Sequence, residues 1–526
     1  MTLFWDFSLT EGLPGRKSHA NELTMKIETF LQHFRLRENP FVAEEARDDE
    51  IYHNIMNSGV AHPEFEKIFG RPDRPSTSVV FGEKGSGKTA LRLLMEQRLR
   101  EYNDSHADKK TWIVRYDEWN HMVDRTVGSD GAASDPENFK QIRLEDHIDK
   151  IISMVVTEVV DAASRTASSK VSRELVKTLR KMPRQHRLDL AYLTLLFDQP
   201  SLSTRSERWR KLVRILKVNQ LITPTQAMYA FGGGAMVTIL GLLDIFMVQM
   251  LVPYSFLAVA GGGLVAFLGG WFGIGQFFRN LKFKKQIDQE IKVVDHPGSL
   301  LFQQLGQFKA SELDSLPMPK PGDKDARYEL LGRLQRLIRG LGFVSMTVLV
   351  DRVDEPSLVN GNPEKMRNLM WPLFTHKILQ QDGLGIKMLL PIELGYELRK
   401  QDADFFMGAR LDKGNLIERL EWTGVNLFDI CNHRVEAVCE HAEGLENTSL
   451  TDLFEDQVSV QDLVDALDQM KQPRDAFKFL YEIIIQHCKG STDADPVFLI
   501  PKLTLEQVRR HQSQRVQDLA RGYSAA

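Results

Sequence analysis

Cysteine is scarce in this chain of 526 residues, which contains three: Cys431, Cys439 and Cys488. Their spacing lacks the pattern of a metal site, and so few thiols argue against a disulfide-stabilised secreted fold. They fit core residues of a protein in a reducing compartment. A large excess of either charge is lacking as well, because the chain has 67 Lys and Arg residues and 71 Asp and Glu residues, for a net charge of −4. Bulk charge therefore gives no case for binding nucleic acid.

A signal-peptide pattern is also missing, since no N-terminal segment has the basic, apolar and small-residue order of a secretory leader. Residues 1–23 show no clear periodicity, and Met25, where a helical pattern begins, is an alternative start of the protein. What the chain has is an ordinary globular balance of 42% hydrophobic and 26% charged residues. Its length leaves room for roughly two to four domains.

One glycine-rich stretch organises the sequence. Residues 82–89 read Gly-Glu-Lys-Gly-Ser-Gly-Lys-Thr, the G-x-x-x-x-G-K-T pattern of a phosphate-binding P-loop, or Walker A motif. The β-branched run at 76–81 predicts a buried strand before it, and the helix formers at 90–99 predict a helix after it. In that context the glycines let successive backbone N–H groups point at one anion, and the helix N-terminus adds partial positive charge.

We expect this loop to bind ATP with Mg²⁺. Lys88 would reach the β- and γ-phosphates, and the Thr89 hydroxyl would hold the metal ion. The alternative is a glycine-rich turn that matches the pattern by accident. The predicted nucleotide-binding residues are Gly82, Glu83, Lys84, Gly85, Ser86, Gly87, Lys88, Thr89 and Ala90.

A second motif follows much later in the chain. The hydrophobic run 343–350 predicts a strand that ends in Asp351, the Walker B pattern, and this carboxylate would hold Mg²⁺ through its water shell. The next residue, Arg352, cannot act as a base, so Asp354 and Glu355 are the candidates to activate the attacking water. The alternative is that these two carboxylates cap the following loop, which would leave ATP hydrolysis slow.

Two apolar runs, Ala227–Val248 and Pro253–Phe278, lie between the motifs. Each is long enough to cross a hydrocarbon layer of about 30 Å. Basic residues mass at both outer flanks and the turn between the runs is uncharged, so the positive-inside rule places the flanks in the cytoplasm. Gly269 and Gly273 would allow close helix contact, and Asp244 lies near the outer end. The alternative is a pair of buried core helices in a soluble protein.

Further strands are predicted at 110–117, 386–391 and 417–422, alternating with helices that include 144–163 and 366–379. This order predicts an α/β fold, a parallel P-loop NTPase sheet flanked by helices. A helical insert would carry the transmembrane hairpin, and a C-terminal helical lid would follow. The predicted domains are an N-terminal helical segment at 1–60, a first NTPase section at 61–135, the insert at 136–325 with spans near 226–248 and 253–278, a second NTPase section at 326–425, and the lid at 426–526.

The order of strand, P-loop, insert with hairpin, Walker B, strand and lid resembles the KAP-type P-loop NTPases, which belong with the STAND and AAA+-related ASCE ATPases. The stretch Asp351–Glu355 resembles the D-x-h-D-E form of NACHT and related STAND proteins. The KAP form more often has acidic residues in its first two places and D-R at its end, so Arg352 and Glu355 depart from it. The wider STAND/KAP-like class is therefore the firmer resemblance.

The resemblance also implies roles for three more segments. Residues 36–41 resemble the segment that packs near the adenine in many AAA+-type ATPases, although a helix-stop turn explains Pro40 equally well. Arg474, in the order Gln-Pro-Arg-Asp, resembles the sensor-2 arginine, and a proline at a helix start also has a plain structural reason. Arg410 lies where these families can carry an arginine finger across a subunit interface. Lys88, Asp354, Glu355, Arg410 and Arg474 are thus the predicted catalytic residues.

The implied function is that of a bacterial ATPase in the cytoplasmic (inner) membrane, multi-pass, with both termini and the NTPase domain in the cytoplasm. Its nucleotide state would drive a conformational switch in signalling, scaffolding or defence. One alternative is a nucleotide-gated scaffold with negligible turnover, and another is a soluble AAA+ remodelling ATPase whose apolar hairpin is a subunit interface. The expected partners are the lipid bilayer, a further copy of the chain in a homo-oligomer and an unidentified protein; no sequence signature supports nucleic acid.

Overall fold

A computed structural model describes residues 24–42, 45–56, 61–128, 135–164, 170–200, 205–218, 224–248, 252–320, 323–409, 411, 415–440 and 447–520. The chain forms two compact units. The helical unit consists of Met1–Phe65, Gly82–Leu94 and Leu420–Ala526, and the sheet unit consists of Glu66–Phe81 and Met95–Arg419. The glycine-rich loop at 82–89 therefore belongs to the helical unit, while Asp351 belongs to the sheet unit.

The sheet unit is built on a five-stranded parallel sheet, which confirms the predicted α/β class. The spatial order is β2-β3-β4-β1-β5, so β4 lies between β1 and β3 and β2 forms one edge. The β-branched and apolar residues of β1, β3 and β4 are almost wholly buried, as a sheet covered on both faces requires. The strands are β1 (Ser78–Gly82), β2 (Lys110–Tyr116), β3 (Phe343–Val350), β4 (Leu384–Pro391) and β5 (Asn415–Ile417).

Two predicted elements differ from the structure. The strand expected at 417–422 is wrong, because β5 ends at Ile417 and the following residues turn to contact the glycine-rich loop. The single helix expected at 366–379 is interrupted, because Pro372 cannot donate a backbone hydrogen bond. A 3-10 turn at Trp371–Leu373 therefore separates two short helices.

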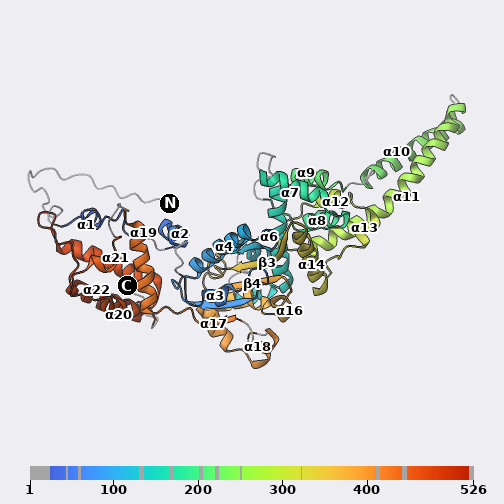
Figure 1. Cartoon of the computed structure of the whole chain (residues 1–526). Coiled ribbons are helices and arrows are strands. Elements are labelled where there is room, and N and C mark those ends of the chain that lie inside the picture. Colours follow the sequence, from blue (N-terminus) through green and yellow to red (C-terminus); the bar gives the residue numbers. More distant parts are fainter. Residues whose placement is uncertain are drawn as a thin grey trace, which may run out of the picture. The chain divides into compact units, whose positions relative to one another are not determined.

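Helices cover the sheet and continue into the insert (Figure 1). Those next to the sheet are α3 (Phe65–Phe69), α4 (Lys88–Ser105), α5 (Asn120–Val127), α6 (Leu144–Ser164), α14 (Lys324–Gly340), α15 (Pro363–Met370), α16 (His376–Leu379), α17 (Ile392–Arg399) and α18 (Ala403–Ala409). The insert adds a 3-10 turn at Pro136–Gln141, α7 (Lys170–Lys181), α8 (Arg184–Phe197), α9 (Arg205–Leu216), α10 (Pro224–Leu243), a π-turn at Asp244–Val248, α11 (Val252–Glu290), α12 (Gly298–Leu305) and α13 (Ala310–Asp314).

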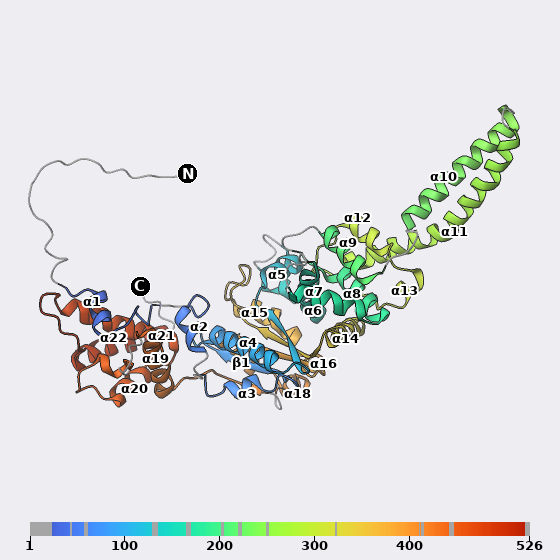
Figure 2. The same ribbon diagram turned by 45° about the horizontal axis from the view of Figure 1, so that its top comes forward.

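The two long apolar helices α10 and α11 lie side by side (Figures 1 and 2). Glycines make this approach possible: a Cβ atom on Gly269 would lie 2.6 Å from the backbone oxygen of Ala227, and one on Gly262 would lie 2.8 Å from that of Gly234. At the turn, Ser255 Oγ bonds Asp244 Oδ2 at 2.5 Å. Both helices are long and apolar enough to cross a membrane, and few of their residues are buried.

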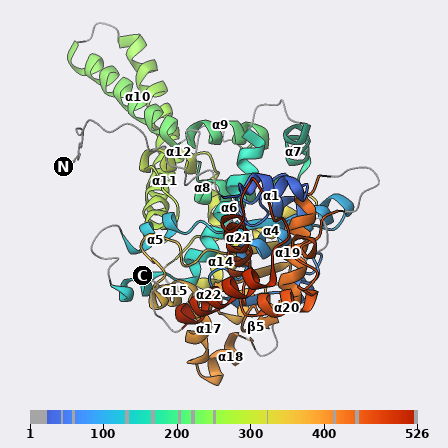
Figure 3. The same ribbon diagram turned by 90° about the vertical axis from the view of Figure 1, so that its left-hand side faces the viewer.

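The helical unit gathers its helices into a bundle (Figure 3). It contains α1 (Ile27–His33), α2 (Glu50–Ile55), α19 (Gly424–Val438), a 3-10 turn at Thr451–Leu453, α20 (Val460–Asp468), α21 (Pro473–Gly490) and α22 (Lys502–Ala520). A buried ion pair joins Arg434 of α19 to Asp49, with Arg434 Nη1 2.5 Å from Asp49 Oδ2. Arg434 Nε also donates to the Pro40 carbonyl at 2.7 Å, so the segment 36–41 is held against the bundle.

Candidate functional site

The glycine-rich loop follows β1 directly and curls through two residues with positive φ. Gly85 has φ +98° and Gly87 has φ +89°, conformations that L side chains rarely adopt. The loop closes tightly, since a Cβ on Gly82 would lie 2.4 Å from Ser86 Oγ. Ser86 is 1% exposed, and its hydroxyl has no hydrogen-bond partner among the described residues. A buried hydroxyl without a partner, inside a loop of glycines, is a feature that a bound oxyanion would satisfy.

Lys88 begins α4 and turns back over the loop. Its Nζ donates to the backbone carbonyls of Gly82 and Glu83, at 2.8 Å each. The ammonium group is therefore held above the loop, where it can exchange these carbonyls for phosphate oxygens. Thr89 lies in the first turn of α4, at the helix end that carries partial positive charge. The order of strand, loop and helix thus places both predicted residues as the motif requires.

Residues from the C-terminal bundle lie against the loop. Trp422 Nε1 donates to the Ser86 carbonyl at 2.8 Å, and the Gln472 amide donates to the Glu83 carboxylate. The Arg474 backbone N–H approaches the Gly85 carbonyl at 3.5 Å, and a Cβ on Gly85 would lie 3.0 Å from Arg474 Cβ. The structure therefore brings the predicted Arg474 next to the loop. It does the same for Trp422 and Gln472, which the sequence did not single out, although Gln472 stands in the same short motif as Arg474.

Tyr52 of α2 is a second residue that was not predicted. Its hydroxyl donates to the Ala90 carbonyl at 2.6 Å, in the first turn of α4. Burial, with the nearby Asp49 carboxylate as a smaller cause, raises the pKa of Tyr52 well above its usual value. The hydroxyl therefore stays protonated and acts as a permanent donor to α4. No local sequence signal distinguishes such a tyrosine from an ordinary core residue.

Asp351, in the sheet unit, directly follows β3 and is 1% exposed. Its backbone is held on both sides by residues at the end of β2. The Asp351 N–H donates to the Tyr116 carbonyl at 3.3 Å, and Trp119 Nε1 donates to the Asp351 carbonyl at 2.8 Å. Trp119 stacks on Tyr116 with ring centroids 4.1 Å apart. These two hydrogen bonds thus fix the backbone that carries the predicted metal-binding carboxylate.

The two candidate bases have different surroundings. Arg352 adopts a left-handed backbone conformation, φ 60°, and its guanidinium pairs with the Glu355 carboxylate. That hydrogen bond raises the pKa of Arg352 above its usual value. The Asp354 side chain has no such partner among the described residues, while the Asp354 carbonyl accepts the Gly361 N–H at 2.9 Å. Asp354 is therefore the carboxylate that is available to a water molecule.

The two predicted motifs follow strands β1 and β3, whose places in the sheet are known. Strands β1 and β3 run in parallel with β4 between them, so their carboxyl ends reach the same edge of the sheet. Two strand spacings separate them by about 9.5 Å. The glycine-rich loop begins where β1 ends, and Asp351 begins where β3 ends. In open parallel sheets, ligands bind outside the carboxyl ends of the strands.

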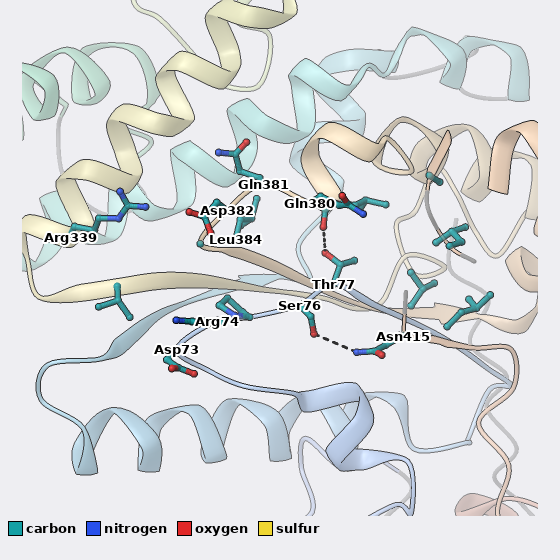
Figure 4. Close-up of a pocket in the computed structure, with 18 residues that line it drawn as sticks. Asp73, Arg74, Ser76, Thr77, Arg339, Gln380, Gln381, Asp382, Leu384 and Asn415 are labelled. Atoms are coloured by element: carbon teal, nitrogen blue, oxygen red, sulfur yellow. Dashed lines mark hydrogen bonds between the residues drawn. The ribbon is translucent and has the colours of Figure 1, made fainter. Parts of the chain in front are cut away.

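A cavity of about 720 Å³ lies at the opposite, amino-terminal edge of the sheet (Figure 4). Residues just before or at the start of β1, β4 and β5 line it, including Ser76, Leu384 and Asn415. Asn415 Nδ2 donates to Ser76 Oγ at 3.4 Å, and Thr77 Oγ1 donates to the Leu379 carbonyl at 2.8 Å. Because of its position, this cavity is not part of the candidate site at the carboxyl ends.

One predicted site residue, Arg410, lies outside the described residues. Among the residues that are described, no group of three or more His, Cys, Asp and Glu side chains is arranged to hold a metal ion. A magnesium site of the predicted kind needs fewer protein ligands than that, because phosphate oxygens and water complete the coordination.

Comparisons with known proteins returned no similar family, relative or fold: the chain matches no protein-family model, no curated protein and no solved structure. The described residues themselves form an α/β unit with a five-stranded parallel sheet, of a kind consistent with a Rossmann-like or P-loop fold. A helical insert with two contacting apolar helices accompanies it.

Proposed function

We propose that this chain is a membrane-anchored P-loop NTPase of the STAND/KAP-like class that binds and hydrolyses Mg-ATP to drive a conformational switch. One observation carries the proposal: a glycine-rich loop ending in Lys88 and Thr89 follows β1, and an acidic residue, Asp351, follows β3 at the same edge of a parallel sheet.

The residues of the loop fit a triphosphate. Backbone N–H groups of 87–89 and the Ser86 hydroxyl, which has no partner among the described residues, would supply donors, and the Lys88 ammonium, now on two carbonyls, would supply the positive charge. The Thr89 hydroxyl and the Asp351 carboxylate, through water, would hold Mg²⁺. When bound, Mg²⁺ neutralises charge that develops on the β- and γ-phosphate oxygens during transfer.

The remaining groups orient and activate water. Asp354 accepts its proton, since the Glu355 carboxylate is occupied by Arg352. Arg474, beside Gly85, adds positive charge at the phosphate end of the loop. Arg410 of a further copy of the chain would complete the site if the protein works as a homo-oligomer. The membrane and an as yet unidentified protein are the other proposed partners.

Two hydrogen-bonded routes support a coupling between the Asp351 region and the apolar hairpin. In the first, Arg125 of α5, the helix that follows Trp119, donates to the Lys292 carbonyl at 3.3 Å and pairs with Asp295, just beyond α11. In the second, Arg327 of α14 donates to the Glu290 carbonyl at the end of α11, at 3.0 Å. Movement at the end of β2 can therefore reach the hairpin.

The second route continues into α6. Arg327 Nη2 lies 3.4 Å from Asp149 Oδ2, and both side chains are almost wholly buried. Two residues earlier, His147 Nδ1 accepts from the Tyr116 hydroxyl at 2.8 Å. Since Tyr116 also holds the Asp351 backbone, α6 connects the predicted metal-binding carboxylate to the C-terminal end of α11.

The exposed apolar side chains of α10 and α11 favour a membrane anchor over a soluble remodelling ATPase. Tyr229, Phe246, Leu257 and Trp271 are each more than 70% exposed, on helices whose mutual contact is already filled by glycines. In the most apolar stretch of each helix, only 11% of the α10 residues and 18% of the α11 residues are buried. A core hairpin of a soluble protein would bury these faces.

A non-hydrolysing, nucleotide-gated scaffold is the second candidate function. The observation that favours it is the pairing of Glu355 with Arg352, which removes one of the two nearby carboxylates from the water. The two functions share nucleotide binding and differ in turnover.

The experiment that tests the proposal compares Lys88→Ala with Lys84→Ala in purified, detergent-solubilised protein. Lys84 is exposed on the same loop, so it controls for the loss of one positive charge. We expect Lys88→Ala to weaken Mg-ATP binding and to lower hydrolysis at least about 100-fold, and Lys84→Ala to stay near wild type. Wild-type ATP affinity in Lys88→Ala would refute the nucleotide site, whereas tight binding without measurable turnover in wild type would select the scaffold.

A further inference from the structure

The outer edge of β2 is not covered by another strand in the part of the chain that the structure describes. A cavity of about 940 Å³ lies along this edge. Residues 111–115 of β2 line it, as do one side of α6, from Lys150 to Asp161, and one side of α4, from Glu96 to Asn103. We call it the β2 groove.

Two contacts identify which backbone groups of β2 face the groove. The amide of Asn103 binds both the N–H and the C=O of Thr111, at 2.8 and 2.9 Å, from outside the sheet. At the other end, the Tyr116 carbonyl accepts the Asp351 N–H, on the β3 side. Because successive residues of a strand direct their backbone groups to opposite edges, Ile113 and Arg115 point theirs into the groove.

Helices wall the groove on both faces of the sheet. The Arg115 side chain donates to Glu96 of α4 at 2.8 Å, whereas the Tyr116 side chain bonds His147 of α6. Adjacent side chains of a strand point to opposite faces, so α4 and α6 lie on opposite faces of β2. The open edge is thus recessed between two helices, a shape that admits one extended chain.

Lys150 places a positive charge in this groove. The residue is 8% exposed, and no hydrogen bond or ion pair of its ammonium group exists among the described residues. Burial lowers the pKa of Lys150, and the Glu118 carboxylate beyond the end of β2 partly offsets this. At the other end of the edge, the indole N–H of Trp112 is buried without a partner among the described residues. Trp112 packs on Phe343 with ring centroids 4.8 Å apart, which makes that end apolar.

We propose that the β2 groove binds an extended segment of a partner protein, which pairs with β2 through Ile113 and Arg115 and places a carboxylate on Lys150. The paired donors and acceptors of these two residues recur about every 6.7 Å, the repeat of a neighbouring strand and not of a compact small molecule. The ammonium group of Lys150, a largely buried residue, selects an acidic residue, because a carboxylate is the partner that best offsets the burial of a lysine.

A second copy of this chain is a poorer occupant, because its own β2 edge is recessed between α4 and α6 in the same way. The helices of the two copies would meet before their β2 strands could pair. A single extended segment of a partner protein has no such conflict. The proposal does not rest on nucleotide binding, and Lys88→Ala should bind the peptide as wild type does.

The test selects random linear peptides displayed on phage against the full-length protein in detergent, and measures the affinity of one enriched, fluorescently labelled peptide. We expect the enriched peptides to share an acidic residue. Ile113→Pro removes the outward N–H without touching the pairing with β3, so it should weaken binding at least about 10-fold, while Ile113→Thr, which keeps the N–H, should stay within about 3-fold.

The charge is tested in the same assay. Lys150→Met should weaken binding at least about 10-fold and abolish the preference for the acidic residue over its amide in the peptide, whereas Lys177→Met on the exposed side of α7 should change nothing. Unchanged thermal unfolding midpoints show that the variants are folded. Peptides that bind Ile113→Pro or Lys150→Met as well as wild type would overturn the proposal. So would an Ile113→Cys variant that forms disulfide-linked dimers through β2, because the occupant would then be a second copy.

Discussion

The indole N–H of Trp119 donates a hydrogen bond of 2.8 Å to the backbone carbonyl of Asp351. The donor is 2% exposed and the acceptor residue 1% exposed, so neither group can turn to water instead. Together with the Tyr116 carbonyl on the other side, this bond holds the end of β3 in register with the end of β2. A carboxylate that must lie within reach of a metal ion gains from such a fixed backbone.

Replacing Trp119 with Phe keeps the aromatic ring and removes the N–H. The Asp351 carbonyl is then buried without its partner, at a cost of about 1–3 kcal/mol. We expect Trp119→Phe to raise the Mg²⁺ concentration needed for half-maximal hydrolysis and to leave ATP binding without metal unchanged. Titrating Mg²⁺ in an ATPase assay measures the first quantity, and binding of a labelled ATP analogue in chelator measures the second.

Trp371→Phe is the matched control, because the buried Trp371 indole N–H has no partner among the described residues. It should leave both quantities at their wild-type values. Equal effects of the two substitutions would show that loss of a buried indole, and not release of Asp351, explains the result.

Substituting Asp354 and Glu355 one at a time shows which of the two carboxylates activates the attacking water. Glu355 is held by Arg352, and the Asp354 side chain is not. If Asp354 takes the proton of the attacking water, Asp354→Asn should lower hydrolysis by about 100-fold or more with ATP affinity unchanged. Glu355→Gln should lower it by less than about 3-fold, since its carboxylate is not directed at water. Rate measurements under single-turnover conditions decide between them, and equal, slow turnover in both variants would exclude the pair from the mechanism.

Arg474 is expected to contribute to nucleotide affinity because the glycine-rich loop and the start of α21 meet at Gly85. Arg474→Ala should weaken ATP binding by about 10-fold or more, the loss expected for one charge-assisted contact to phosphate. Lys478→Ala, one turn further along α21, is the control for a loss of positive charge on the same helix. Isothermal titration with ATP measures both, and ADP serves to show whether the effect depends on the γ-phosphate.

Local sequence patterns predicted those parts of the molecule that local physics determines. The run at 76–81 and the glycines after it predict β1 and its loop, because buried strands and positive-φ turns leave direct marks on composition. Composition also predicts the apolar helices of the insert: α10 and α11 begin within three residues of the predicted starts, although α11 continues past the predicted end at 278 to Glu290. The helix expected at 366–379 failed at Pro372, a local signal that was present and overlooked.

Contacts between distant residues left no such mark. Trp119 and Asp351 are brought together only because β2 and β3 become neighbours in the sheet. Trp422 was assigned to a strand at 417–422, yet its indole N–H donates to the Ser86 carbonyl. The pairing of Arg352 with Glu355 depends on a left-handed backbone at Arg352, which a sequence of ordinary residues does not reveal.

The buried His147 predicts a pH dependence of stability. Its Nε2 donates to the Leu369 carbonyl at 2.8 Å, so Nδ1 is the acceptor from Tyr116 and the ring is neutral. Burial lowers the pKa of His147 from 6.5 to about 4. Between these values the unfolded chain binds a proton that the folded chain does not, so stability falls as the pH falls from about 6.5 to 4, by up to about 3 kcal/mol.

His147→Gln removes this titration and keeps a donor for the Leu369 carbonyl. The drop in thermal unfolding midpoint from pH 7.5 to pH 5 should therefore be smaller in His147→Gln than in wild type. Asp149, whose pKa burial raises to about 7, acts in the opposite direction, and it cancels when the two proteins are compared. His106→Gln, at an exposed position just beyond the end of α4, should show the wild-type drop. An identical drop in all three proteins would mean that His147 is not buried in its neutral form.

Some glycines of the apolar hairpin lie at the contact between α10 and α11 and others face open space, so a Gly→Ala substitution should affect the two kinds differently. A Cβ on Gly269 would lie 2.6 Å from backbone atoms of Ala227 and Phe231, whereas one on Gly275 would meet nothing within 4 Å. Gly269→Ala should therefore force α10 and α11 apart and lower the thermal unfolding midpoint in detergent. Gly275→Ala should leave it unchanged or raise it slightly, because alanine favours the helix by about 0.5–1 kcal/mol over glycine. Both variants should stay in the membrane fraction after a carbonate wash, since each helix remains apolar. Release of wild type by that wash would contradict the membrane anchor, and equal midpoints for the two variants would contradict the close packing of the hairpin.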